Sequence, residues 1–487
     1  MDVRVRFAPS PTGYLHVGGL RTALYNYLFA KHHNGKMILR IEDTDRSRYV
    51  ENAIENLISS LKWAGINYDE GPDIDGNYGP YKQSERLELY NKYANLLLEN
   101  GKAYYAFDSS EELEAMRQKH QDTYDPKYKR LEMKNQFTLG IEKSKELIAN
   151  GSEFVIRLFV PQDEEISFND IIRGEIKVST NDIDDQILIK SDGYPTYHLA
   201  NVVDDHLMEI SHVIRGEEWL PSTPKHILLY QSFAWTPPLY AHLPLLLNKD
   251  KSKLSKRQGS VAVEDFIQKG YLKDAFVNFI ALLGWNPTGD REIYSIEEFI
   301  EFFNLEKVNK AGAVFDIQKL DWVNQQYIKQ SSPELLASIL LNAPNEYNIS
   351  ITNDYAIKLV NLFKERITFV SDIYTIAPFM FTEQINYDKE YFKKRWNDKS
   401  EGIITPLIQL YADTDNFTHS NLHDISKSYA ESINTKIGEI MHPIRLMLTG
   451  QSSGASMFET MEVLGKEKCI NRFRFFLNNV LNKLKNE

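Results

Sequence analysis

The N-terminal segment contains the pattern that most restricts the fold. Residues 3–7 alternate apolar side chains with arginines, which predicts a short strand, and the prolines and glycine within 8–13 end it. An apolar helical pattern follows Gly18 and Gly19 and runs through 20–28. A strand, a glycine-containing loop and a helix in this order place backbone N–H groups and a helix dipole where a phosphate can bind.

The alternation of strands and helices continues and predicts a parallel sheet. A strand at 36–41 ends at Glu42, and acids at the carboxyl end of a buried parallel strand lie where open α/β sheets bind ligands. Alternatively, Thr44 or Asp45 only caps the next helix. Helices are expected at 50–65 and 83–99.

Between about 102 and 185 the pattern changes to that of an α+β insertion. A charged helix is expected at 111–119, and strands at 154–160, 166–168 and 176–178. Aromatic residues stand at Tyr104, Tyr105 and Phe107, with no cluster of cysteine or histidine that could hold zinc. We therefore expect no metal site here.

The α/β pattern resumes at 186–190 and ends with a last strand at 239–247. Tyr197 and Asn201 are four residues apart, so both lie on one face if this segment is a helix. A strand at 212–214 ends in Arg215, which again places a polar group at a carboxyl end. His198 and His206 are interpreted as capping or core histidines and not as metal ligands.

A basic loop follows the last strand, at 251–260. Lys251, Lys253, Lys256 and Arg257 alternate there with hydroxyl groups and precede Gly259. Such a loop can be a solvated surface, or it can bind phosphate. Beyond it, residues 262–325 are expected to be helical with a break at 285–287, and the rest of the chain almost entirely helical. Examples of the C-terminal helices are 353–371, 403–411, 421–437 and 456–464.

Length and charge limit the class of protein. The chain of 487 residues predicts about three to four domains. It has one cysteine, which excludes an internal disulfide framework and fits a reducing cytoplasm, and no apolar run near the roughly 20 residues that span a bilayer. A net charge of -12 opposes a polyanionic partner unless basic groups cluster on one face. Candidate clusters are Lys127, Lys129 and Arg130; 251–257; and Lys466, Lys468, Arg472, Arg474, Lys483 and Lys485.

Several motifs in order resemble those of the bacterial glutamyl-tRNA synthetases, a family of class I aminoacyl-tRNA synthetases (ligases). The resemblance covers essentially the whole chain. It is most specific at 6–13, His16-Val17-Gly18-Gly19, 40–45, 195–206, 214–219 and Lys253-Leu254-Ser255-Lys256-Arg257, and weaker at 447–450, 458–460 and 464–467. Gly19 stands where many class I enzymes have a second histidine, and the glutamyl branch commonly has a small residue there.

The resemblance implies a Rossmann-type α/β catalytic domain with an α+β insertion, then a helical stem-contact domain and an all-α anticodon-binding domain. The implied boundaries are 1–101 and 186–245 for the Rossmann halves, 102–185 for the acceptor-end insertion, 246–328 for the stem-contact domain and 329–487 for the anticodon-binding domain. The implied partners are tRNA(Glu), with tRNA(Gln) left open, and L-glutamate. A cytoplasmic monomer acting in protein biosynthesis is expected.

The resemblance also implies the reaction and its residues. L-Glutamate would react with ATP to give glutamyl-adenylate, and the acyl group would pass to the 3′ terminal adenosine of the tRNA, with Mg²⁺ arriving with ATP and no zinc. His16, Lys253 and Lys256 would be catalytic. The implied ATP-binding set is His16, Gly18, Gly19, Glu218, Trp219, Lys253, Ser255, Lys256 and Arg257. The implied glutamate-binding set is Arg6, Ala8, Ser10, Glu42, Tyr197, Asn201 and Arg215.

Within the glutamate set, Arg215 and Arg6 are the candidates for the side-chain carboxylate, because a guanidinium can meet a carboxylate with two parallel hydrogen bonds. Glu42 would bind the ammonium group. The nearest alternative is a glutaminyl-tRNA synthetase, in which the C-terminal region is built from β-barrels. A truncated paralogue that glutamylates a modified tRNA base would lack that region, and a non-catalytic tRNA-binding paralogue would be expected to lack the lysine loop, which is present here.

Overall fold

The structure is a computed structural model that describes residues 2–120, 127–254, 261–347 and 349–486. The chain folds into two compact units. The first comprises Met1–Lys269 and Lys273–Ile317, and the second comprises Gly270–Leu272 and Gln318–Glu487. The two are described separately below, and the finer five-part division stays a prediction.

The first unit begins with the expected strand, loop and helix. Strand β1 (Arg4–Phe7) pairs in parallel with β2 (Lys36–Leu39), and helix α1 (Val17–His32) connects them. Val5 and Phe7 are buried as the alternation predicts, but Arg6 is buried as well. A parallel strand is covered on both faces, so its second face also has to be filled.

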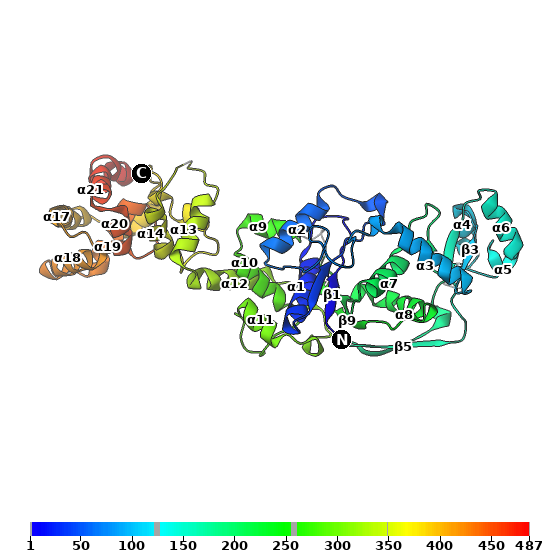
Figure 1. Ribbon diagram of the computed structural model, residues 1–487. Coiled ribbons are helices and arrows are strands. Elements are labelled where there is room, and N and C mark those ends of the chain that lie inside the picture. Colours follow the sequence, from blue (N-terminus) through cyan, green and yellow to red (C-terminus); the bar gives the residue numbers. More distant parts are fainter. Residues whose placement is uncertain (1, 121–126, 255–260, 348, 487) are drawn as a thin grey trace. The chain divides into compact units, whose positions relative to one another are not determined.

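The remaining parallel strands follow from distant segments. Strand β8 (His212–Gly216) pairs in parallel with β9 (Leu239–Leu243), and the Ser211 N–H donates to the Arg4 carbonyl at 2.9 Å, which joins the start of β8 to β1. Figure 1 shows the N-terminal β1 and α1 beside α7 (Tyr197–Leu207) and α8 (Thr223–Ser232). The carboxyl ends of β1, β2 and β8 therefore lead into one region.

One strand lies in a different sheet from the one that the sequence pattern predicts. Strand β7 (Ile187–Ile189) pairs antiparallel with β4 (Val155–Leu158), which pairs antiparallel with β3 (Ala103–Ala106). Conversely, the hairpin of β5 (Glu165–Asp170) and β6 (Gly174–Ser179) joins the parallel sheet through the pair Asp170 and Tyr240. A short apolar run contains no information on which sheet it enters.

The last predicted strand is broken at Pro244, which lacks the N–H that a ladder needs. It continues as β10 (Leu246–Leu247), paired in parallel with β11 (Ala313–Val314). The other helices of the first unit are α2 (Ala53–Trp63), α3 (Leu87–Glu99), α4 (Ser110–Lys119), α5 (Gln136–Leu139), α6 (Ile141–Ala149), α9 (Val263–Lys269), α10 (Lys273–Ala281) and α11 (Ile296–Phe302). Short 3-10 turns stand at Arg46–Arg48, Gln83–Glu85, Thr180–Asp182, Glu217–Ser222 and Leu305–Lys307.

The second unit has helices and no strand among its described residues. Its helices are α12 (Ile317–Gln330, from the end of the first unit), α13 (Pro333–Asn342), α14 (Asn353–Phe363), α15 (Asp372–Ile376), α16 (Lys389–Arg395), α17 (Ser400–Asp413), α18 (His419–Ser432), α19 (Ile437–Thr449), α20 (Met457–Leu464), α21 (Lys466–Phe475) and α22 (Leu481–Asn486). A 3-10 turn at Pro378–Met380 and a π-helical turn at Phe476–Val480 complete it. The β-barrel alternative for this region does not fit.

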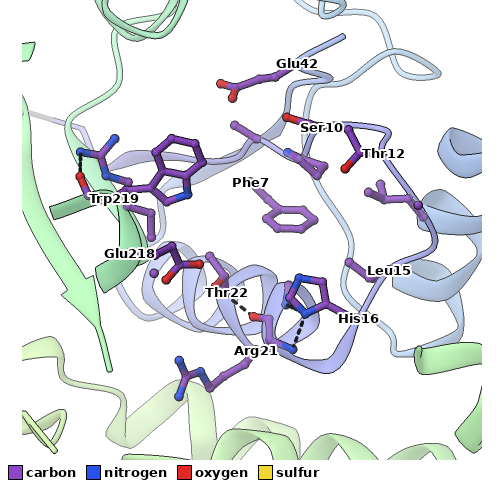
Figure 2. A pocket seen from close by; sticks show the side chains of 18 of the residues that line it. Phe7, Ser10, Thr12, Leu15, His16, Arg21, Thr22, Glu42, Glu218 and Trp219 are labelled. Carbon is purple, nitrogen blue, oxygen red and sulfur yellow. Dashed lines mark hydrogen bonds between the residues drawn. The ribbon is translucent and has the colours of Figure 1, made fainter. Parts of the chain in front are cut away.

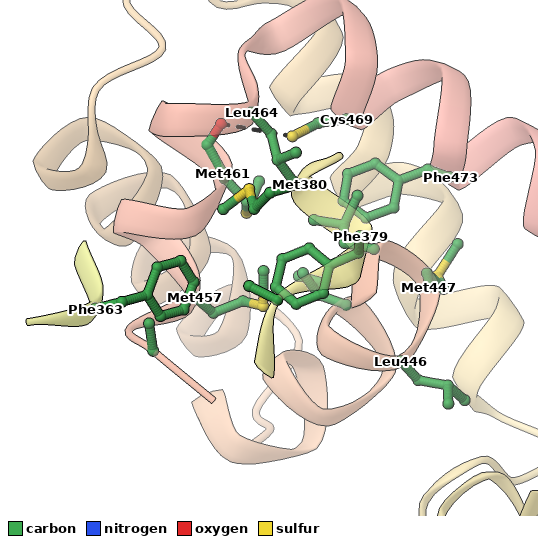
Figure 3. Close-up of a cluster of buried hydrophobic side chains, with 14 of the residues drawn as sticks. Phe363, Phe379, Met380, Leu446, Met447, Met457, Met461, Leu464, Cys469 and Phe473 are labelled. Atoms are coloured by element: carbon green, nitrogen blue, oxygen red, sulfur yellow. Dashed lines mark hydrogen bonds between the residues drawn. The ribbon is translucent and has the colours of Figure 1, made fainter. Parts of the chain in front are cut away.

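The expected helix 353–371 ends early, at Phe363. Further along, Asp372 accepts hydrogen bonds from the Thr368 and Phe369 backbone N–H groups at 2.9 and 2.7 Å, which makes a turn before α15. The core of this unit is richest in leucine and isoleucine, with some phenylalanine and methionine, and Figure 3 shows Cys469 within it beside Met461 and Phe473. The Cys469 thiol donates to the Met461 carbonyl at 3.5 Å.

Among the described residues, no helix combines the length and the apolar character needed to cross a lipid bilayer.

Candidate active site

A cavity of about 500 Å³ lies where the carboxyl ends of β1, β2 and β8 meet the start of α1. Figure 2 shows Ser10 and Glu42 at one end of it, His16 at another, and Glu218 and Trp219 on the opposite side. Each predicted site residue within the described part of the chain lines this cavity. They are Arg6, Ala8, Ser10, His16, Gly18, Gly19, Glu42, Tyr197, Asn201, Arg215, Glu218, Trp219 and Lys253. Ser255, Lys256 and Arg257 lie outside the described residues.

His16 caps helix α1. Its Nδ1 accepts hydrogen bonds from the Gly18 and Gly19 backbone N–H groups at 3.1 and 3.3 Å. The sequence predicts that these N–H groups face a phosphate directly, whereas here the imidazole covers them. A neutral imidazole that accepts at Nδ1 has its proton on Nε2, so the ring presents an N–H donor at the positive end of the helix dipole.

Gly18 leaves room for this ring. A Cβ added at Gly18 would lie 3.0 Å from His16 Cε1, which is closer than ordinary van der Waals contact. A side chain there would push against the imidazole that accepts from the two N–H groups. The glycine therefore permits the cap.

The basic loop is attached to the α1 entry on one side and to β10 on the other. Leu254 N–H donates to the Leu246 carbonyl at 2.9 Å, just before the undescribed stretch. Just after it, Val17 N–H donates to the Val261 carbonyl at 2.9 Å, and Val263 N–H donates to the Leu15 carbonyl at 2.8 Å. The two motifs that are far apart in the sequence therefore meet at one edge of the cavity.

Aromatic and acidic side chains form a second wall. Trp219 is 39% exposed, and its ring lies 4.3 Å from that of Tyr197 between centroids, tilted by 37°. Glu218 lies over Gly216, where an added Cβ would meet its Oε2 at 2.2 Å. An exposed indole beside a backbone without a side chain is a surface on which a planar base can stack.

Below the cavity lies a buried ion network with three arginines and three carboxylates. Asp205 binds Arg6 Nε at 3.0 Å and Arg40 Nη1 at 2.8 Å, and Asp204 binds Arg86 Nε at 2.7 Å. Arg40 Nη2 also binds Glu42 Oε1 at 3.1 Å. Because the charges balance, the network can be buried without a ligand.

Glu42 is the carboxylate of this network that lines the cavity, and Arg6 lines it as well. Burial raises its pKa, and the nearby Arg40 and Arg6 only partly offset that effect. The Asn201 side-chain amide lies beside Glu42, in the orientation that donates to Asp205 Oδ2 at 3.3 Å and accepts from Arg40 Nη2 at 3.2 Å. A ligand cation bound beside the Glu42 carboxylate would favour its charged form.

Arg215 differs from Arg6 because none of its close partners is a carboxylate. It is 5% exposed, and its guanidinium donates to Tyr197 Oη at 2.9 Å, Thr223 Oγ1 at 2.9 Å and His242 Nε2 at 3.0 Å. Within the described part of the chain, no ion pair at 4.0 Å or less is formed by Arg215. Arg6 by contrast is held by Asp205 through both Nε and Nη2, at 3.0 and 3.4 Å. Among the described residues that line this cavity, Arg215 is therefore a cation with no carboxylate in contact.

Sequence reasoning gives no individual role to several residues around the site. Arg40 and Asp205 lie inside motifs that carry the resemblance, so the sequence indicates that both positions matter. It does not predict that their side chains contact each other. His242 and Asp170, which form a buried pair at 2.6 Å, have no such signal. The two histidines interpreted as structural lie in packing roles: His206 stacks on Trp235 at 3.7 Å, and His198 contacts His226 at 3.1 Å.

Two residues of the predicted basic clusters are not surface charges. Arg130 forms a bidentate pair with Asp185 at 2.6 and 2.8 Å and lies over the Phe159 ring. Arg472 is 5% exposed and donates to the carbonyls of Phe379, Thr382 and Leu448. Both guanidiniums are used inside the protein.

Among the described residues, no group of three or more His, Cys, Asp or Glu side chains is placed to hold a metal ion.

Comparison with known proteins identifies two family models along the chain. Residues 2–322 match the tRNA synthetases class I (E and Q), catalytic domain, and residues 321–477 match an anticodon binding domain. The glutamate–tRNA ligase of Chlorobium luteolum is 48% identical, with 97% of each chain covered. That of Chloroherpeton thalassium is 49% identical, with 96% of each chain covered.

A solved structure is similar in three dimensions. The crystal structure of a glutamate tRNA ligase from Elizabethkingia meningosepticum, in complex with its amino acid, has a TM-score of 0.93 and 41% identity and covers 99% of this chain and 100% of that one. With both family models in order and this identity over nearly the full length, the chain belongs to the glutamate–tRNA ligases, a family of class I tRNA synthetases.

Proposed function

We propose that this chain is a glutamate–tRNA ligase that activates L-glutamate with ATP and transfers it to the 3′ terminal adenosine of tRNA(Glu). The observation that carries the proposal is the presence of two opposite charges in one cavity: Arg215, which has no carboxylate partner among the described residues, and Glu42, whose pKa burial raises. An amino acid with a carboxylate side chain has complementary groups for both.

The side-chain carboxylate of glutamate would bind at Arg215. A guanidinium can donate two parallel hydrogen bonds to a carboxylate, and the hydroxyl of Tyr197 lies 2.9 Å from Arg215 Nη1 to extend the same site. Arg6 would add positive potential from its position on Asp205. Ala8 and Ser10, on the loop after β1, would complete the wall.

The ammonium group of glutamate would bind at Glu42, with Asn201 beside it. Arg40 holds Glu42 at 3.1 Å and Asp205 holds Arg40 at 2.8 Å, so the carboxylate is fixed before the ligand arrives. Fixing both charged ends of the substrate leaves its α-carboxylate in one orientation.

ATP would occupy the part of the cavity between α1, Trp219 and the basic loop. His16 would donate from Nε2 to a phosphate, while Gly18 and Gly19 keep the imidazole in place. Glu218 and Trp219 would contact the adenosine. Lys253, Ser255, Lys256 and Arg257 would bind the β- and γ-phosphates, with Mg²⁺ arriving on ATP and coordinated mainly by its phosphates.

The reaction would then proceed in two steps. An α-carboxylate oxygen of glutamate attacks the α-phosphorus, the bond to the β-phosphate oxygen breaks, and glutamyl-adenylate and pyrophosphate form. A ribose hydroxyl of the terminal adenosine next attacks the acyl carbon, which releases AMP and leaves glutamate esterified to the tRNA. Because the first nucleophile is already anionic, the protein mainly positions the reactants and stabilises phosphate charge.

The test is ATP-dependent attachment of labelled glutamate to separately prepared glutamate and glutamine tRNAs, in the presence of Mg²⁺. Charging of the glutamate tRNA alone supports a discriminating ligase, and charging of both supports a relaxed one. Folded protein that charges neither overturns the proposal. We propose that the protein is a monomer and acts in the cytoplasm. A single species at the mass of one chain in analytical ultracentrifugation would support the monomer.

A further inference from the structure

We propose that Asp170 and His242 are positioning residues for Arg215. They fix the orientation of its guanidinium without neutralising its positive charge. This inference rests on the proposed function, because it assigns Arg215 to the side-chain carboxylate of glutamate. It adds two residues, neither of which lines the cavity, to the determinants of specificity for a carboxylate over an amide.

The three side chains form a buried line from the hairpin of β5 and β6 to the cavity. Asp170 Oδ2 contacts His242 Nδ1 at 2.6 Å, and His242 Nε2 accepts from Arg215 Nε at 3.0 Å. Asp170 is 1% exposed and His242 is 0% exposed. The contact between Asp170 and His242 is therefore shielded from bulk solvent.

Asp170 determines which nitrogen of His242 accepts. Its carboxylate is an acceptor, and it is itself held by the backbone N–H groups of Ile172 and Arg173 at 3.0 and 2.8 Å. The proton of His242 therefore lies on Nδ1, toward Asp170, and Nε2 offers a lone pair to Arg215. With the opposite tautomer, the Nε2–H would face the Arg215 Nε–H.

His242 is neutral in this arrangement. Burial lowers its pKa to about 4, with Arg215 acting in the same direction and Asp170 against it. The pKa of Asp170 is lowered although burial opposes this, because His242 and backbone N–H groups donate to the carboxylate. The imidazole therefore orients the guanidinium without an opposite charge in contact with it.

A carboxylate in direct contact would act differently. Asp205 binds Arg6 through two oxygens and compensates its charge. If Asp170 contacted Arg215 in the same way, a substrate carboxylate would compete with it for the same donors. Placing the imidazole between the two keeps the orientation and leaves the charge for the ligand.

The variant that tests this is D170N. An asparagine side chain is nearly the same size and can keep accepting from Ile172 and Arg173 through Oδ1. The His242 backbone N–H, which lies 3.1 Å from Oδ2, would keep Oδ1 as an acceptor at 3.4 Å. The NH₂ group would replace Oδ2, which lies 2.6 Å from His242 Nδ1. That favours the Nε2–H tautomer, which opposes Arg215 Nε–H. We expect the KM for glutamate in pyrophosphate exchange to rise about tenfold or more, since a buried donor loses its acceptor, with the KM for ATP changed less than about twofold.

Two further readouts separate positioning from a general structural role. The ratio of kcat/KM for glutamate over glutamine should fall in D170N, because the amide depends less on an oriented cation. The ¹⁵N shifts of His242 should report the Nδ1–H tautomer in the wild-type protein and Nε2–H in D170N. H212Q is the matched control, since His212 contacts Ser211 at 2.9 Å and does not line the cavity.

A second pair of variants tests the acceptor itself. H242Q retains an acceptor for Arg215 and a donor for Asp170, whereas H242L has neither, so H242Q should recover most of the glutamate KM that H242L loses. Equal losses in both, or a D170N protein with an unchanged glutamate KM, would overturn the inference. If D170N does not fold, a wild-type spectrum with His242 as Nε2–H or imidazolium at pH 7 overturns it. Failure of wild-type protein to activate glutamate counts instead against the proposed function.

Discussion

Arg6 and Arg215 line the same cavity, and their neighbours decide what each can do. Arg6 is compensated by Asp205 at 3.0 Å, whereas the closest partners of Arg215 are neutral. A guanidinium already paired with a carboxylate adds less to the binding of a second one. The sequence offers both residues as candidates, and their partners favour Arg215 as the main contact for the substrate side chain.

We predict that R215A weakens glutamate binding much more than ATP binding. Loss of a charge-assisted contact worth roughly 1.5–3 kcal/mol corresponds to a rise of about 10- to 150-fold in the KM for glutamate. Pyrophosphate exchange at varied glutamate and varied ATP measures both constants. R117A is the control, because Arg117 is an exposed residue that pairs with Glu114 at 3.5 Å and does not line the cavity. Equal rises in the two Michaelis constants would contradict the assignment.

We predict that glutamate binding depends on pH through Glu42. Its pKa is raised by burial, so the carboxylate that binds the ammonium group is lost on acidification at a higher pH than for an ordinary glutamate. The KM for glutamate should therefore rise as the pH falls through that raised pKa. In E42Q the KM should be about 10- to 100-fold higher and should lose this dependence. The exposed E55Q on α2 should keep the wild-type profile, and an E42Q profile with the same slope as wild type would count against Glu42.

The burial of Arg6 and the role of His242 illustrate where residue-level reasoning stops. Alternation along a strand predicts which side chains share a face, but burial of the second face depends on segments about two hundred residues away, here Asp205. A motif indicates which positions matter, but it does not show whether a charged side chain there is compensated by an ion-pair partner. His242 follows no pattern at all, because its significance arises only from contacts with Asp170 and Arg215.

Helix α1 has a cap that also serves the cavity. We predict that the two roles of His16 can be separated by substitution. H16A should destabilise the first unit by about 0.5–2 kcal/mol, since two N–H groups lose their acceptor, whereas asparagine is a good N-cap and H16N should lose less. Both should lose adenylate formation. Thermal melting gives the first effect and pyrophosphate exchange the second, and an H16N variant with full activity would remove the proposed phosphate contact.

The basic loop is an element whose ends are fixed on the α1 entry and on β10. We predict that K256A folds normally and loses about 100- to 1,000-fold in the rate of adenylate formation, the usual effect of removing one donor that stabilises transition-state charge. Single-turnover measurement with bound ATP and glutamate gives this rate. K249A is a control outside the loop. Near-normal charging by K256A would contradict the proposed role of Lys256 in adenylate formation.

At the level of elements, the sequence predicts most helices and strands and fails on their partners. Strand β7 is expected where it occurs, yet it pairs with β4 and not with the parallel sheet. Pro244 divides the last strand because proline lacks a donor, which is visible in the sequence. The turn that Asp372 makes with the Thr368 and Phe369 N–H groups falls inside the segment expected to be helical, and a helical pattern alone does not predict it.

At the scale of the whole molecule, each unit has a hydrophobic cluster of its own. We predict that a fragment of residues 318–487 folds alone as an all-helical domain. Its far-UV circular dichroism should have helical minima, and its melting should be cooperative, because the cluster of the second unit consists almost entirely of residues within it. A spectrum with strand content, or gradual melting without a transition, would contradict this. The matched measurement is the same melting followed in the full chain.

The single thiol of the chain lies inside the core of that second unit, and burial raises the pKa of Cys469 to about 12. A thiol that is neither exposed nor ionised reacts with a disulfide reagent only when its surroundings open. The rate at which the unmodified protein reacts with such a reagent therefore reports the opening of the helical unit alone. Because the chain has no second thiol, all of the coloured product that the reagent releases comes from reaction of Cys469.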